Sequence, residues 1–591
     1  METKWLLDNI YTSVSGEDFK RDFKEYKKEI NTLNEWARTA FKRENNPVRI
    51  LSEYILMKNR LLTYEKLSMY VSLSLSVDTS NEELTGVLDN IEELEAECAE
   101  HEALFSAYLK DIDNIDELIE ESPVLKEHSY FIKRAKEDSS HTLSVQEEMI
   151  ISKMQNTGSS LWEKQWEQLT SNMEITFECK GKTYNGPLSS VRNMAYSADR
   201  DLRISAYKAE LNAYESIKVP GAFCMNGIKG EVITLSKLRG YSSPLGMTLW
   251  QSAVDEEILN AMWSAFKEEL AELIPYFKGK AELLGYKDKK LPFYELFAPV
   301  GKDKEYSLEK ARDCVIDAFT SFSEEMGKFA ENAFSNRWID LMPKKGKAGG
   351  AFCEAIHPIK ESRILTNFGG TFNDVVTIAH ELGHAYHDSR LYEATPLNST
   401  YPMPIAETAS TFCETLLINH VLKTASDEEA LVILENDLSG IMQTLSDIYS
   451  RFLFEDTVFK RRGEGSLSAD TLCDIMVKAQ AEAYGDTLSR EYMHSFMWLC
   501  KPHYYDAAFN YYNYPYAFGM LLSKALYGRY EKEGKGFVPL YNKVLQASAT
   551  GDLADVAKIA GFDLKDKAFW KDSLEVVKTE VTDFIQKLKK R

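Results

Sequence analysis

Apolar residues recur at three- and four-residue intervals through the first part of the chain, with glutamate and lysine between them. This spacing is typical of amphipathic helices, because residues three or four apart share one face of a helix. It predicts helices over Phe19–Leu33, Pro47–Leu73 and Asn81–Leu109. Ser144-Val-Gln-Glu147 has the spacing of a capping box, so we expect another helix to begin there.

The period changes to two where apolar and polar residues alternate from Ile175 to Cys179. Lys180-Gly181 can turn, and the pattern predicts a β-hairpin that ends at about Leu188. A second pair of short strands is predicted at Gly350–Ile356 and Arg363–Phe368. Helical patterns dominate elsewhere, so we predict a mainly α fold with a small sheet.

Composition narrows the class of protein. The chain has 591 residues, 44% of them apolar and 27% charged, as in an ordinary globular protein. A net charge of −22 without any basic block argues against a nucleic-acid partner. No secretory signal or membrane-length apolar stretch is evident, and the eight cysteines form no CxxC pair. We therefore expect a cytoplasmic protein with reduced thiols and no membrane partner.

The stretch TFNDVVTIAHELGHAYHD (371–388) predicts a helix directly after the second predicted sheet. Gly369-Gly370 breaks the preceding strand, and Asn373 or Asp374 is expected to cap the helix. Apolar residues on the remaining positions predict that the helix is buried along one side.

This helix carries the HExxH pattern. His380 and His384 are four residues apart, so they lie within about 40° of each other on one face. Two imidazoles can therefore reach one metal ion, with Glu381 on the adjacent edge of the same turn as a general base. The pattern predicts a zinc-dependent peptidase.

A catalytic zinc ion takes three protein ligands and keeps one position open for water. The next predicted helix, IAETASTFCETLLINH (405–420), places Glu407 and Glu414 about two turns apart on one face. Either carboxylate could bind the metal, leaving the other to orient a histidine ligand. His387 also shares the histidine face, where it could bind the metal, support a ligand or pack.

The motif HELGHAYH (380–387), followed after 19 intervening residues by ETASTFCE (407–414), resembles the thimet oligopeptidase, neurolysin and oligoendopeptidase F family. It is most similar to oligoendopeptidase F. The resemblance covers at least residues 200–580 and implies a neurolysin-like, two-lobed helical zincin with a deep substrate cleft. It also implies an N-terminal helical lobe over residues 1–190 and a catalytic domain over residues 191–591.

The resemblance implies roles for single residues as well. The first glutamate of the second motif is the family's zinc ligand, so Glu407 is expected to complete the site. Glu414 and His387 are then expected to support the ligands from outside. One zinc ion per chain, short peptide substrates and cytoplasmic peptide turnover follow from the resemblance, with a monomer or small homo-oligomer as the expected assembly.

The segment KPHYYDAAFNYYNYPYAFG (501–519) holds one histidine and six tyrosines. Such aromatics often only pack, but peptide hydrolysis needs donors for the developing oxyanion, which a tyrosine hydroxyl or histidine N–H can supply. The resemblance implies that this segment faces the zinc ion. The catalytic candidates are His503, Tyr512 and Tyr505, and the substrate-lining candidates are Tyr511 and Tyr514.

Glycines at the start of the predicted strand at 349–353 would let a second backbone approach its edge. A simple turn before a buried strand would have the same sequence. An extended peptide could instead add to the edge through main-chain hydrogen bonds, which the resemblance favours. Gly349, Gly350 and Ala351 are therefore candidates for substrate binding.

Two other functions compete. Glu381–His384 and Glu491–His494 are both ExxH pairs, and with Glu407 and Glu414 they would supply the ligands of a di-iron carboxylate bundle. A non-catalytic peptide-binding scaffold with a structural metal is the second alternative, although it would need a fourth protein ligand. No GxSxG motif supports a serine nucleophile.

Overall fold

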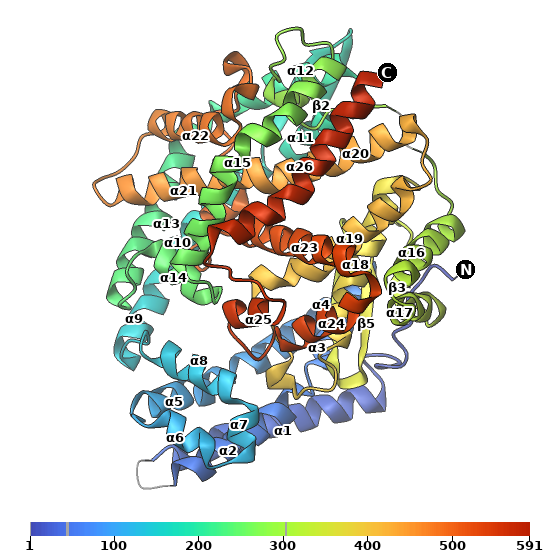
Figure 1. The fold of residues 1–591 in the computed structure, drawn as a ribbon. Helices are drawn as coiled ribbons and strands as arrows, with labels where there is room; N and C mark the ends of the chain where they lie inside the picture. Colours follow the sequence, from blue (N-terminus) through green and yellow to red (C-terminus); the bar gives the residue numbers. More distant parts are fainter. Residues whose placement is uncertain (1, 43–45, 302–303, 591) are drawn as a thin grey trace. The chain divides into compact units, whose positions relative to one another are not determined.

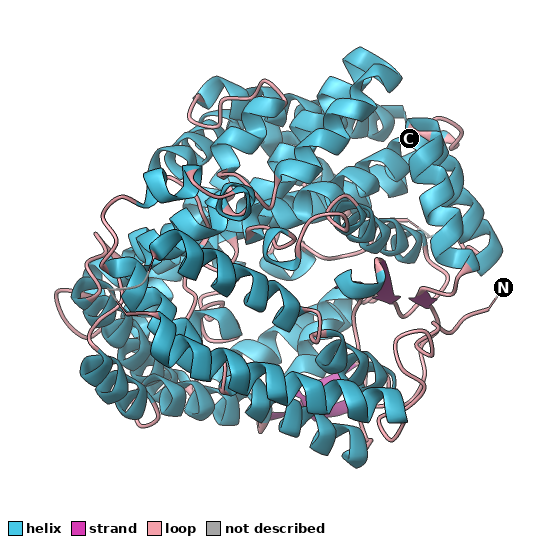
Figure 2. Cartoon of the chain, turned by 90° about the horizontal axis from the view of Figure 1, so that it is seen from below, coloured by secondary structure: helices cyan, strands magenta, loops and turns pink. Residues whose placement is uncertain are grey.

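A computed structural model describes residues 2–42, 46–301 and 304–590. Helices account for most of the ribbon and the strands are short, as Figure 2 shows. The prediction of a mainly α fold with small sheets is therefore confirmed. Among the described residues, no helix is both long and apolar enough to cross a membrane.

The chain divides into two compact units, each assembled from three separate stretches (Figure 1). Unit 1 contains Met1–Thr142, Lys304–Val421 and Arg529–Gly561. Unit 2 contains Leu143–Asp303, Leu422–Gly528 and Phe562–Arg591. The predicted domain boundary between residues 190 and 191 stays a prediction.

Unit 1 begins with helices that bury their apolar stripes against one another around Tyr54 and Phe105, whose rings stack at 4.1 Å. These N-terminal helices are α1 Glu17–Ala40, α2 Pro47–Leu62, α3 Lys66–Val77, α4 Glu82–Ala96, α5 Ala99–Lys110, α6 Ile115–Glu120, α7 Pro123–Glu127 and α8 Ser129–Ser139. The later helices of this unit are α16 Leu308–Phe322, α17 Glu324–Ser335, α18 Phe372–Ser389, α19 Met403–Leu422, α24 Val538–Ala547 and α25 Leu553–Ile559.

Two of the three predicted N-terminal helices are each broken into two. α2 ends and α3 begins around Thr63, where backbone bonds close to the third rather than the fourth residue back. Between α4 and α5, the side-chain amide of Asn34 donates to the carbonyl of Glu97 at 3.0 Å. A side chain from α1 thereby takes a carbonyl that a continuous helix would use, so the helix is interrupted there.

The sheet of unit 1 has the strand order β3-β5-β4. β4 (Phe352–Ile356) and β5 (Glu361–Leu365) form an antiparallel pair, and the two-residue strand β3 (Ile339–Asp340) runs parallel to β5. The predicted strand pair is confirmed with shorter bounds, while β3 was not predicted. α18 packs against β4 and β5, so the sheet supports the helix that bears the HExxH motif.

Unit 2 contains the predicted hairpin, β1 (Glu174–Cys179) and β2 (Lys182–Pro187), paired antiparallel. Lys180 and Gly181 both have positive φ, which matches a two-residue turn and confirms the predicted position. The helices of this unit are α9 Val145–Gln155, α10 Ser159–Ser171, α11 Leu188–Asn193, α12 Arg200–Tyr214, α13 Lys218–Leu238, α14 Pro244–Gln251, α15 Glu256–Leu283, α20 Asp427–Met442, α21 Ile448–Arg462, α22 Ala469–Ala483, α23 Tyr514–Glu533 up to Gly528, and α26 Lys567–Lys590. The predicted capping box at the start of α9 is present.

Candidate metal centre

A tight turn between β5 and α18 aims the HExxH helix. Gly370 has a φ of +92°, a conformation that favours glycine, and Thr371 then caps the helix. The Asp374 carboxylate accepts hydrogen bonds from the backbone N–H groups of Gly369 and Thr371, at 3.0 and 2.8 Å. The predicted cap at Asn373 or Asp374 is therefore wrong by a few residues, because Asp374 acts as the partner of a Thr371 capping box.

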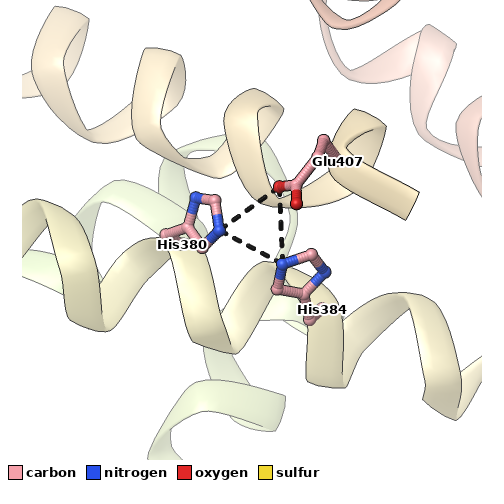
Figure 3. A group of neighbouring side chains, drawn as sticks. All are labelled: His380, His384 and Glu407. Carbon is pink, nitrogen blue, oxygen red and sulfur yellow. Dashed lines mark hydrogen bonds and ion pairs between the residues drawn. The ribbon is translucent and has the colours of Figure 1, made fainter. Parts of the chain in front are cut away.

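His380 and His384 of α18 and Glu407 of α19 point their polar atoms toward one another (Figure 3). The two Nε2 atoms are 3.1 Å apart. Glu407 Oε2 lies 3.4 Å from His380 Nε2 and 3.6 Å from His384 Nε2. The three side chains are 23%, 19% and 20% exposed, so they are largely but not fully buried.

These separations fit a metal ion. Zinc binds nitrogen and oxygen at about 2.0–2.2 Å with tetrahedral geometry, which places donor atoms about 3.3 Å apart. Separations of 3.1, 3.4 and 3.6 Å surround that value. Among the described residues, this is the one group of at least three His, Cys, Asp or Glu side chains that could hold an ion. Three donors leave one tetrahedral position open.

Gly383 lets α18 and α19 approach closely at this point. A Cβ added there would lie 2.7 Å from the Ala409 carbonyl oxygen and 2.7 Å from Ser410 Cα, both in the α19 backbone. Glycine is therefore required between the two histidines, because any side chain would separate the helix that carries them from the helix that carries Glu407.

Further groups hold the three donors in place. Glu414 Oε1 lies 2.7 Å from His380 Nδ1, so the carboxylate accepts the ring N–H and turns Nε2 toward the site. Ser410 Oγ donates to Glu407 Oε2 at 2.9 Å, and His384 has a backbone hydrogen bond with Ala406. Sequence reasoning foresaw a supporting role for Glu414 but missed Ser410, one turn after Glu407.

The two histidines carry opposite pKa shifts. Burial disfavours a charged His380 ring, yet the Glu414 hydrogen bond and nearby carboxylates raise its pKa to about 9. Burial, followed by the charge of His380, lowers the pKa of His384 to about 3. The pair thus favours one positive charge between its facing nitrogens, which is the position where a bound cation would lie.

Glu381 is buried beside the donors, with 5% of its surface exposed. Burial raises its pKa to about 7, with the charges of Glu407 and Glu414 adding to the effect and His380 opposing it. A carboxylate with a pKa near neutrality is suited to exchange protons with a substrate or water.

His387 faces away from the three donors. It is fully buried, its Nε2 lies 2.8 Å from Ser548 Oγ, and its ring stacks on Tyr401 with centroids 4.0 Å apart. The possibility that His387 is a ligand is not supported by this position. Tyr401, which sequence reasoning missed, also donates to Asp388 Oδ1 at 2.8 Å, and burial raises the pKa of Asp388 to about 7.

Gly349, Gly350 and Ala351 directly precede β4, which lies at an edge of the three-stranded sheet. Asn367, just past β5, donates to the carbonyls of Ala348 and Gly350 at 3.0 and 2.9 Å, and Gly350 has a φ of +79°. The structure therefore places these candidates on an ordered turn next to a strand edge, and their role in substrate binding stays a prediction.

The aromatic segment belongs to unit 2. The His503 ring stacks on that of Tyr512, with centroids 6.1 Å apart, and Tyr512 is exposed. Tyr505 is 2% exposed and stacks on Trp166, at 4.6 Å. Tyr511 and Tyr514 are also buried. The expected roles of all five residues stay predictions, and Tyr512 is the tyrosine among them with an exposed side chain.

The second ExxH pair does not form a metal site. Glu491 lies in a single 3₁₀ turn, Arg490–Tyr492, and Met493 is extended, so Glu491 and His494 do not share a helical face. His494 is buried in unit 2 with its Nε2 3.2 Å from Glu210 Oε1. Glu381 and His384 belong to unit 1. This arrangement is unlike a di-iron bundle, in which both pairs project from helices into one core.

Comparisons with known proteins agree with a metallopeptidase site. The family model described as Peptidase family M3 matches residues 193–576, and one described as Oligopeptidase F matches residues 111–175. Oligopeptidase PepF of Bacillus subtilis is 26% identical over 576 residues, which cover 95% of this chain and 84% of that protein.

Solved structures share the fold. The crystal structure of oligoendopeptidase-F from Enterococcus faecium has a TM-score of 0.70 at 19% identity, with 97% of this chain and 100% of that one covered. A crystal structure from Chlamydophila abortus has a TM-score of 0.80 at 22% identity, with 98% of each chain covered.

An HExxH helix that faces a glutamate on a second helix is the ligand arrangement of a metallopeptidase. Because the M3 model matches well over half of the chain, the protein belongs to peptidase family M3. It is a metalloendopeptidase with peptide substrates, and the resemblance noted from the two motifs is confirmed. The non-catalytic scaffold is thereby set aside.

Proposed function

We propose that the chain is a zinc-dependent oligoendopeptidase that hydrolyses internal bonds of short peptides. One observation carries the proposal: the donor atoms of His380, His384 and Glu407 form a triangle of zinc-site dimensions beside the buried Glu381. The metallopeptidase family supports the reaction class, while the identity of the metal and the mechanism belong to the proposal.

His380, His384 and Glu407 would hold one zinc ion per chain. Bound zinc would polarise the scissile carbonyl and lower the pKa of its water to roughly 7. Glu414 fixes the His380 tautomer, so that Nδ1 carries the proton and Nε2 keeps its lone pair for the metal. Ser410 orients Glu407 in the same way.

Glu381 acts as the general base and then as the general acid. Its carboxylate accepts a proton from the attacking water and delivers it to the leaving amine. Its burial supports this role, because a desolvated carboxylate binds a proton tightly enough to retain it until the amine departs.

We also propose that unit 2 supplies the oxyanion donors. His503 is the main candidate, with Tyr512 and Tyr505 as tyrosine candidates, and each would donate a hydrogen bond to the developing oxyanion. Gly349, Gly350 and Ala351 would bind substrate backbone, with Tyr511 and Tyr514 lining the substrate site. Loss of such a donor should lower kcat by about 10²–10³-fold while zinc content stays unchanged.

The decisive test compares Glu381→Gln with Glu331→Gln, a control at an exposed glutamate of α17. With an internally quenched peptide, Glu381→Gln should bind one zinc per chain but lose nearly all turnover, while the control keeps both. A chelator should abolish wild-type cleavage and added zinc should restore it. Wild-type turnover by Glu381→Gln, or a preference for another metal in the restored enzyme, would sink the proposal.

Location and assembly complete the proposal. We propose cytoplasmic peptide turnover by a monomer or small homo-oligomer, without a nucleic-acid partner. Cell fractionation with an antibody and light scattering of the purified protein test the two parts. A membrane-bound or secreted protein would contradict the first, and a large assembly the second.

A further inference from the structure

A second polar cavity lies within unit 2. It has a volume of about 260 Å³, and three cationic side chains line it: Arg192 of α11, Arg451 of α21, and Lys501, which precedes the aromatic segment. Aromatic rings form much of the remaining wall, namely those of Tyr196, Tyr207, Phe293, Tyr294 and Phe297. The cavity therefore combines apolar walls with positive charge, in a chain whose net charge is −22.

The acids around this cavity already have cationic partners. Glu210 Oε1 lies 3.1 Å from Arg192 Nε and 3.2 Å from His494 Nε2. Asp447 pairs with Arg451. Glu210 is 9% and Asp447 5% exposed at the side chain, so these pairs are buried and leave no acid available for a further cation.

Lys501 is the cation without a partner. Among the described residues, its ammonium forms no ion pair and no side-chain hydrogen bond, although the side chain is only partly exposed. Burial, followed by the charge of Arg451, lowers its pKa. Arg451 adds an unpaired donor, because its buried Nε has no hydrogen-bond partner. A charge kept in such a position is costly unless an anion compensates it.

The wall of the cavity also contains an irregular helix segment. Gln443, which lines the cavity, begins the π-helical turn Gln443–Asp447 between α20 and α21. π-turns are rare and recur at functional sites, because the wider turn re-aims the side chains that follow it. Here the turn carries Asp447, whose carboxylate holds Arg451 at the cavity.

We propose that this cavity binds the free carboxylate of a peptide's C-terminal residue, with the aromatic walls receiving an apolar or aromatic side chain. Lys501 and Arg451 Nε supply the donors for the carboxylate. The volume lies just below the roughly 300–1,000 Å³ of drug-sized ligand sites, so it suits one terminal residue. The peptide nature of the ligand rests on the proposed function, whereas the anion site itself does not.

Calorimetry on the full-length protein with small probes tests the site without turnover. N-acetyl-phenylalanine should bind the wild type with a Kd of about 0.1–1 mM. N-acetyl-phenylalaninamide, which lacks the charge, should bind about tenfold more weakly or worse. Equal binding of acid and amide overturns the proposal, and this comparison needs no variant to fold.

Variants locate the binding. Lys501→Met should weaken binding of the acid at least about tenfold but leave that of the amide unchanged, while Lys501→Arg restores much of the loss. Lys478→Met, at an exposed lysine of α22, is the matched control and should behave as wild type. If Lys501→Met folds and binds the acid normally, the assignment is wrong.

Two further arms separate other sources of binding. The carboxylate could bind the zinc ion instead, so the titration is repeated after chelation, and loss of binding there counts against the cavity. Inorganic phosphate that binds as tightly as the acid and displaces it would overturn the peptide assignment. A protein with the predicted acid preference but no peptidase activity would refute the proposed function and leave the anion site standing.

Discussion

Gly383 is the position where a single methyl group tests the metal centre most sharply. Gly383→Ala adds a Cβ that would meet the Ala409 carbonyl oxygen and Ser410 Cα, each at 2.7 Å. Both atoms belong to the α19 backbone, so no side-chain rotation can relieve the clash. The helices must separate, and α19 carries Glu407 with it.

The size of the effect follows from these distances. Carbon contacts are comfortable at about 3.4 Å or more, so the backbones must move apart by about 0.7 Å. Zinc–ligand distances tolerate about 0.2 Å, which the displacement exceeds. Overpacking of this kind costs about 1–3 kcal/mol, and if most of this strain is relieved at Glu407, zinc affinity falls about 10–100-fold.

Zinc affinity is measured by competition with a chromophoric chelator, alongside circular dichroism to confirm that the variant is folded. Gly440→Ala is the matched control, because Gly440 lies in α20 with nothing within 4 Å of an added Cβ. It should keep wild-type affinity and gain a little stability. Wild-type zinc affinity in folded Gly383→Ala would refute the claim that this glycine sets the spacing between the ligand helices.

Other parts of unit 1 give independent predictions. Glu414→Gln should lower zinc affinity about 10–100-fold by weakening its hold on the His380 tautomer, measured by the same competition. Zinc removal should lower the melting temperature, measured by calorimetry, because the ion binds the folded state; no shift would argue against a folded-state site. Asp388→Asn should raise the free energy of unfolding at pH 8 by about 1–4 kcal/mol, because burial raises the folded-state pKa to about 7. The stability that wild-type Asp388 contributes is present below pH 4 and is lost as pH rises to about 7, so urea titrations should show the gain vanish toward pH 4.

Local patterns were sufficient for much of the fold. The β1–β2 hairpin was predicted at its observed position, because alternation and a two-residue turn are encoded in neighbouring residues. The helical spacing of His380 and His384 likewise brought two imidazoles to one face before any tertiary contact was known. The resemblance then indicated which of two glutamates would face them, a choice that spacing alone left open.

Features that depend on distant partners were missed. The interruption between α4 and α5 arises where Asn34 of α1 takes the carbonyl of Glu97, 63 residues away. The strand β3 has two residues, too few for any periodic signal, and is defined by pairing with β5. Tyr401 gives no motif either, since its importance comes from stacking on His387 and its bond to Asp388.

The proposed metal ligands and their immediate supports lie close together along the chain. β4, β5, α18 and α19 form one continuous stretch from Phe352 to Leu422, and each of His380, His384, Glu407 and Glu414 lies within it. Contacts between residues near in sequence close small loops and form early in folding. We therefore expect this stretch to assemble its donor triangle before the rest of unit 1 is complete. Zinc present during synthesis would then select the correctly paired helices and act as a folding template.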